Sequence, residues 1–216
     1  TYGGNDITNS SAFASVYSTI INTLISGGAK GVVATVPSVT SIPYFTTIPY
    51  NPVPLDNATA SQLNGADGYA SYNGGLDVAF SNGLITNAER LQRKVVFVAG
   101  KNPVVIVDSD LTNLSGLGLP SYRMTTSQDL IVLPASSFIG TTVGGDPLMI
   151  NGVSVPLANK WVLTANEKAK VASATAAYNN TIVSIASAND LAVADMNSIM
   201  NQLVNGLQIE TGQIYT

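Results

Sequence analysis

Residues 10–37 read SSAFASVYSTIINTLISGGAKGVVATVP, and this stretch sets the expected fold class. Apolar side chains recur at helical spacing over residues 10–26, and Ser10 or Ser11 is the candidate N-cap. A Gly-Gly pair then ends the helix, and the β-branched run of residues 30–37 closes on a proline. A helix followed at once by a short apolar strand is typical of a parallel α/β sheet.

A second helix and strand follow near the other end of the sequence. The capping-box sequence TANE, residues 164–167, begins a helix whose apolar stripe continues to residue 185. Residues 191–195, LAVAD, form a strand of the buried type, and a short helix follows over residues 196–206. We therefore expect a single α/β domain over residues 1–216.

The middle of the sequence, about residues 40–156, has a different character. Residues 37–56 carry five prolines and no regular period, which indicates a long loop. Residues 58–92 are mostly helical in pattern. The apolar runs 94–100 and 103–111 are joined by only two residues, which predicts an antiparallel β-hairpin. We interpret 40–156 as a hairpin-containing insertion in the domain; its later part has an extended run over residues 129–138 and a Gly-rich, turn-like stretch over 139–156.

Composition excludes several classes of function. Only 10% of the residues are charged, against an average of about 25%, which favours a secreted or cell-surface protein. The net charge of −4 without a basic cluster argues against a nucleic-acid partner. The sequence has no cysteine and no histidine, so it offers no thiolate, no imidazole base and no ordinary zinc site. Asp108 and Asp110 form an isolated acidic pair that we interpret as a polar turn, and we expect no metal and no cofactor.

No apolar run reaches the roughly 18 residues of a membrane span, so we expect no transmembrane segment.

Three segments together carry a family resemblance. They are GGND at residues 3–6, GAKGVVATVPSVTSIPYF at 28–45 and LAVADMNSIMNQL at 191–203. With the helix between the first two, they resemble the SGNH (GDSL-type) esterase/lipase family, and most closely its lipases of the Bacteroidetes type. The resemblance covers essentially the whole chain. It implies a three-layer α/β/α flavodoxin-like fold with strand order 2-1-3-4-5, in which ligands bind at the carboxyl ends of the strands.

The resemblance also implies the roles of the first residues. Asn5 matches the family's oxyanion-hole asparagine, whose side-chain amide donates to the oxyanion of the tetrahedral intermediate. Gly3 and Gly4 allow the tight turn that follows the strand. Asp6 either caps the next helix or fixes the Asn5 loop.

The family also uses a serine in a GDS motif and an Asp-x-x-His segment, and neither pattern is present. VDSDL at residues 107–111 is only faintly similar to the GDS motif, because it lacks the glycine and follows GGND instead of preceding it. We therefore expect an internal, partial SGNH domain that is inactive alone and prone to self-association.

Two further groups of residues keep alternative interpretations. Tyr44, Phe45 and Tyr50 lie in the proline-rich segment, where they line an acyl pocket or pack on one another. Asp195 and Asn197 follow the last strand, where they support the catalytic segment or cap the helix that follows.

The expected function is that of a serine esterase or lipase that hydrolyses carboxylic esters of small molecules, lipids or acylated carbohydrates. We expect a secreted, periplasmic or outer-membrane-associated protein. The alternative is a non-catalytic SGNH-like surface module that uses residues 40–156 to hold a glycan or a protein.

Overall fold

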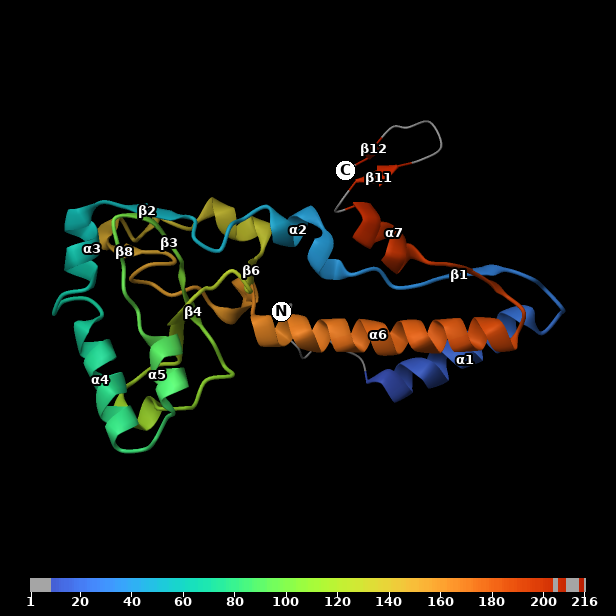
Figure 1. Cartoon of the computed structure of the whole chain (residues 1–216), viewed down its shortest axis with the longest axis horizontal. Helices are drawn as coiled ribbons and strands as arrows, with labels where there is room; N and C mark the ends of the chain where they lie inside the picture. Colours follow the sequence, from blue (N-terminus) through green and yellow to red (C-terminus); the bar gives the residue numbers. More distant parts are fainter. Residues whose placement is uncertain (1–8, 204–205, 209–213, 216) are drawn as a thin grey trace. The chain divides into compact units, whose positions relative to one another are not determined.

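The computed structural model describes residues 9–203, 206–208 and 214–215. These residues form two compact units. The central unit consists of residues 44–165 and overlaps the predicted insertion 40–156 over residues 44–156. The terminal unit consists of residues 9–43 with the described residues from 166 onward. Helices and strands are mixed along the chain, which confirms the α/β class (Figure 1). None of the described helices combines the length and the apolar character needed to cross a membrane.

The terminal unit is built from helices around one parallel strand pair. Its elements are α1 (Ser10–Ile25), β1 (Val32–Ala34), a 3-10 turn η2 (Val39–Ser41), α6 (Ala165–Ala188), β10 (Ala192–Ala194), α7 (Met196–Leu203), β11 (Leu207–Gln208) and β12 (Ile214–Tyr215). β1 and β10 are parallel, with Val33 opposite Val193, as predicted for strands of a parallel sheet. β11 and β12 form an antiparallel pair.

The N-cap of helix α1 lies one residue before Ser10, the earlier of the two serines expected to cap it. The side chain of Asn9 accepts hydrogen bonds from the backbone N–H groups of Ser11 and Ala12, so Asn9 is the N-cap. The apolar residues of α1 divide into two stripes. Ile21 is buried, whereas Val16, Ile20 and Leu24 are exposed; their exposed fractions are 60%, 50% and 66%. Self-association through this second stripe remains a prediction.

Helix α6 carries the predicted apolar stripe toward α1. Ile182 and Ala186 are buried, and the ring of Tyr178 lies 4.5 Å from the ring of Phe13 on α1. Figure 1 shows α1 running beside α6. Because side chains four residues apart share one face of a helix, Tyr178, Ile182 and Ala186 lie on the same face of α6.

The central unit combines short helices with antiparallel strand pairs. Its elements are α2 (Pro43–Thr46), β2 (Val53–Leu55), α3 (Asn57–Leu63), α4 (Ala70–Ser81), α5 (Asn87–Arg93), β3 (Gly100–Asn102), β4 (Val105–Val107), η3 (Ser115–Leu117), β5 (Tyr122–Met124), β6 (Leu130–Ile131), η4 (Leu133–Ser137), β7 (Thr142–Val143), β8 (Asp146–Ile150), η5 (Asn159–Trp161) and β9 (Val162–Leu163). The strands pair as β2–β3, β4–β5, β6–β9 and β7–β8, all antiparallel.

The core of the central unit lies between its helices and the buried strand β4. Val105 and Ile106 of β4 are fully buried. Leu76 and Ala79 of α4 pack with three further apolar residues into one cluster, which contains Ile85, Leu114 and Leu119. The helical prediction for residues 58–92 is confirmed by α3, α4 and α5.

The predicted hairpin between residues 94–100 and 103–111 is wrong. β3 pairs with β2 and β4 pairs with β5, so the two runs do not pair with each other. Residues 95–98 alternate as a strand does: Val95 and Phe97 are buried, whereas Val96 and Val98 are exposed.

Asparagine side chains replace a partner strand along this segment. Asn73 accepts from Val95 N–H and donates to Val95 C=O, and Asn64 does the same at Phe97. These amides satisfy the backbone groups that a hairpin would have paired.

A different hairpin is present in the part predicted to be turn-like. β7 and β8 are joined by Gly144 and Gly145, whose φ angles are 62° and 78°. A two-residue turn of this kind needs positive φ at both positions, which glycine adopts without strain. The central unit therefore contains a β-hairpin, but its position differs from the expected one.

Candidate functional site

The residues matched to the oxyanion hole lie outside the described part of the chain. Gly3, Gly4, Asn5 and Asp6 precede Asn9, the first described residue. Their roles therefore remain predictions.

A polar cluster lies at the carboxyl ends of β1 and β10. The Thr35 hydroxyl, after β1, donates to Asp195 Oδ1 at 2.9 Å and accepts from Asn197 N–H at 3.0 Å. Asp195 Oδ1 also accepts from Ser198 N–H at 3.1 Å. Asp195 thus caps α7, and the capping alternative for this residue is the one observed. Thr35, which the sequence did not single out, is buried and ties the two strand ends together.

Asn179 of α6 holds the chain where it leaves β1. Its side chain accepts from Val36 N–H at 2.7 Å and donates to Val36 C=O at 2.9 Å. Thr35 N–H donates to the Ala194 carbonyl in the last hydrogen bond of this chain segment to the β10 strand. At Val36, the bonds to Asn179 take the place of such interstrand bonds. A cavity of about 240 Å³ opens here; its lining includes Ser38, Thr40, Asn179, Asn197 and Asn201.

The lining of this cavity is neutral. Hydroxyl and amide groups can donate to or accept from an uncharged polar ligand, but they supply neither a base nor an activated nucleophile. Among the described residues, no group of three or more aspartate or glutamate side chains could hold a metal ion.

The aromatic residues of the proline-rich segment have separate environments. Phe45 is buried and its ring meets that of Tyr44 edge to face, with 5.0 Å between ring centroids. This contact matches the packing alternative. Tyr50 is more exposed, and its carbonyl accepts a hydrogen bond from the Thr125 hydroxyl at 2.7 Å. A role of these residues in an acyl pocket remains a prediction.

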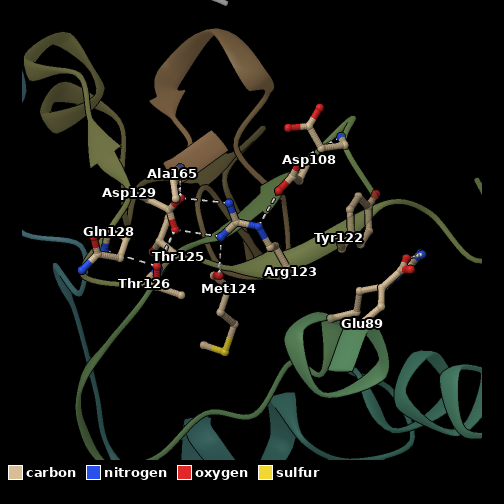
Figure 2. A network of polar contacts seen from close by, with 12 residues as sticks. Glu89, Asp108, Tyr122, Arg123, Met124, Thr125, Thr126, Gln128, Asp129 and Ala165 are labelled. Carbon is tan, nitrogen blue, oxygen red and sulfur yellow. Dashed lines mark hydrogen bonds and ion pairs between the residues drawn. The ribbon is translucent and has the colours of Figure 1, made fainter. Parts of the chain in front are cut away.

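A buried network of charged side chains in the central unit is built around Arg123 on β5 (Figure 2). Its Nε donates to Asp108 Oδ2 at 2.5 Å, and its two terminal nitrogens donate to the two carboxylate oxygens of Asp129 at 2.8 and 2.9 Å. The carboxylate of Asp129 also accepts from Thr126 N–H and Ala165 N–H. All three charged side chains are at least 95% buried.

Charge pairing outweighs burial in this network. Desolvation alone would raise the pKa of Asp129, but hydrogen bonds from Arg123 and the backbone N–H of Thr126 hold that pKa below its usual value. Desolvation would lower the pKa of Arg123, but its bonds to Asp129 and Asp108 raise it. The network joins the end of β4, β5, the turn before β6 and Ala165, all of them within the central unit, so its role is structural.

Sequence reasoning placed Asp108 in a polar turn and missed Arg123 and Asp129. Asp108 does accept from Asp110 N–H, as in such a turn, but its other oxygen binds Arg123. The sequence did contain a signal for this pair: Arg123 and Asp129 lie beside apolar runs in a chain with few charged residues, and charged residues in such positions are buried only when they are paired.

Comparisons with known proteins gave no relative. No family model matches the chain, and no curated protein and no solved structure shows significant similarity to it.

Proposed function

We propose that this chain supplies the oxyanion-hole part of an SGNH-type serine hydrolase that cleaves carboxylic esters. The observation that carries the proposal is the order of elements after GGND at residues 3–6: helix α1, strand β1 and, later, a parallel neighbour β10. The low charge content supports a secreted, periplasmic or outer-membrane location.

The proposal also includes a specific fold within the α/β class. A flavodoxin-like α/β/α sandwich would place β1 and β10 as its fourth and fifth strands, with the end of TYGG as the third. Two features support this assignment: the parallel pairing of β1 with β10, and the cavity beyond Thr35 and Asp195 at their carboxyl ends. Ligands of open α/β sheets bind at that edge.

The proposed chemistry of Asn5 is electrostatic. When a serine hydroxyl attacks an ester carbonyl, the carbonyl oxygen becomes negatively charged, and an amide N–H aimed at it stabilises the transition state. Loss of one such donor lowers kcat by about 10²–10³-fold. Because these 216 residues contain no histidine, an imidazole base has to come from outside them.

Two assays test the proposal. The 216-residue chain should not hydrolyse p-nitrophenyl acetate or butyrate. Hydrolysis that a serine-directed inhibitor abolishes would contradict the claim that the nucleophile and the base lie outside these residues. In the full-length product of the gene that encodes this sequence, Asn5→Ala should lower kcat about 10²–10³-fold with little change in KM.

Asn9→Ala is the matched control in the same enzyme. Asn9 lies four residues away and only caps α1, so its loss should cost about 1 kcal/mol of stability and leave kcat almost unchanged. Equal kcat values for wild type and Asn5→Ala would refute the role of Asn5.

A further inference from the structure

A second cavity lies in the central unit, and none of its lining residues belongs to the proposed esterase site. It is a cleft of about 660 Å³ between the α3–α4 corner, residues 118–122 and the strand β8 with Ser154. The corner is tight because Gly68 approaches the carbonyl of Leu63, where a Cβ atom at residue 68 would lie 2.0 Å from that oxygen. The volume lies in the range of about 300–1,000 Å³ that small-molecule sites occupy.

Three tyrosines contribute to the lining, and the hydroxyls of two of them, Tyr69 and Tyr72, are bonded to backbone carbonyls. Tyr69 donates to Val153 C=O at 2.6 Å, and Tyr72 donates to Tyr122 C=O at 2.7 Å. The rings of Tyr69 and Tyr72 are nearly perpendicular, 6.2 Å apart, and the ring of Tyr122 lies 5.9 Å from that of Tyr72. Because the hydroxyls of Tyr69 and Tyr72 are used inside the protein and Tyr69 is buried, the aromatic surface available to the cleft comes mainly from the half-buried residues Tyr72 and Tyr122.

Besides the tyrosines, the lining contains the polar side chains of Thr59, Gln62, Asp67, Ser71 and Ser154. Ser154 is bonded to the backbone of Ile150 and Leu148. Gln62, Asp67 and Ser71 are exposed, and the structure gives their side chains no hydrogen-bond partner among the described residues. An amide, a carboxylate and a hydroxyl therefore remain available beside the aromatic surface.

The charge of the lining restricts the ligand. Asp67 is its only charged residue, with no lysine or arginine to receive an anion. A fatty acid or a phosphate would therefore meet an unfavourable charge. A purely apolar chain would remove Gln62, Asp67 and Ser71 from water without replacing their hydrogen bonds. A neutral ligand with apolar C–H faces and several hydroxyl groups satisfies both parts of the cleft.

We propose that this cleft binds a neutral pyranose sugar. The C–H face of the ring packs on the tyrosine surface, and its hydroxyls bond to Gln62, Asp67 and Ser71. This binding is independent of ester hydrolysis and of the oxyanion residues, so it can succeed or fail separately from the proposed function.

The test is titration of the 216-residue chain with methyl β-glucopyranoside, methyl β-galactopyranoside and methyl α-mannopyranoside. Saturation-transfer difference NMR and calorimetry measure the binding, and choline and hexanoate serve as a cation and an acyl-chain probe. We expect saturable binding of at least one glycoside with Kd on the order of 1 mM. Absence of saturable glycoside binding, or binding of choline or hexanoate alone, overturns the proposal.

Variants locate the bound sugar. Ser71→Trp should fill the cleft and abolish binding, and Asp67→Asn should weaken it about tenfold through loss of a charged acceptor. Asp190→Asn is the matched control: it changes an exposed aspartate of the terminal unit at a backbone φ of 53° that asparagine also accepts, so Kd should not change.

Thermal melting of each variant separates loss of the site from loss of the fold. If Ser71→Trp melts lower than wild type, the pair Gln62→Ala and Asp67→Asn, both at exposed positions, replaces it and should also abolish binding. Glycoside binding that survives in a folded cleft variant overturns the assignment.

Discussion

Removing the Asp129 carboxylate should destabilise the central unit more than removing any surface carboxylate. In Asp129→Ala, Arg123 loses its two hydrogen bonds to that carboxylate and keeps Asp108 and the Met124 carbonyl as acceptors, while its side chain is 96% buried. The backbone N–H groups of Thr126 and Ala165 lose their acceptor as well. Removing one partner of a buried ion pair lowers the free energy of unfolding by about 3–5 kcal/mol, because the remaining charge stays desolvated.

Urea denaturation measures this loss. The single tryptophan, Trp161, belongs to the same unit and packs on Phe138 with 4.7 Å between ring centroids, so its fluorescence reports the unfolding of that unit. For a slope of about 2 kcal/mol per molar urea, a loss of 4 kcal/mol lowers the midpoint by about 2 M. Domains of this size have only about 5–15 kcal/mol of stability, so the effect is large.

The matched control is Asp77→Ala. Asp77 also binds two cations, Arg90 at 2.6 Å and Lys94 at 3.1 Å, but its side chain is 47% exposed. Water screens such a pair and solvates the cations after the substitution, so its midpoint should move far less. Equal midpoint shifts for Asp77→Ala and Asp129→Ala would refute the claim that burial makes the Arg123 network important.

Five further outcomes are expected. The pKa of Asp129 is lower in the folded than in the unfolded chain, so the ionised carboxylate contributes to the free energy of unfolding above about pH 4. This contribution is lost as the pH falls below that value. The urea midpoint should therefore drop at low pH, and it should drop less steeply in Asp129→Asn. Tyr69→Phe leaves the buried Val153 carbonyl without its donor and should cost about 1–3 kcal/mol by urea denaturation. Because burial raises the pKa of Tyr69, the same variant should lack one of the last tyrosines to ionise in an alkaline absorbance titration, and an unchanged titration would contradict this. Asn179→Ala should speed hydrogen exchange of the Val36 amide, whereas Asn179→Asp, which keeps the acceptor, should protect it better than alanine does. Ile20→Glu should reduce any self-association seen by light scattering, because this residue lies in the exposed apolar stripe of α1; an unchanged mass would exclude that stripe.

Local patterns in the sequence were sufficient where short-range forces decide the structure. The apolar period over residues 10–26 predicted α1, and the short apolar runs around Val33 and Val193 predicted two strands that prove to be parallel neighbours. The buried character expected of residues 191–195 was wrong, because Ala192 and Val193 are exposed. The Thr86 hydroxyl accepts a hydrogen bond from Glu89 N–H and caps α5, as in a capping box over residues 86–89. These signals work because helix periodicity and capping depend on residues only a few positions apart.

Partner choice was decided only by the tertiary structure. The run at residues 94–100 has the alternation of a strand, yet its backbone is satisfied by the amides of Asn64 and Asn73, about 20–30 residues earlier in the chain. The capping-box carboxylate of Glu89 binds Thr112 and Arg93. Arg123 and Asp129 became a buried pair only when β5 and the start of β6 were brought together. A sequence shows which groups need partners, but the folded chain determines which partners come within hydrogen-bonding distance, since long-range contacts depend on the packing of the whole unit.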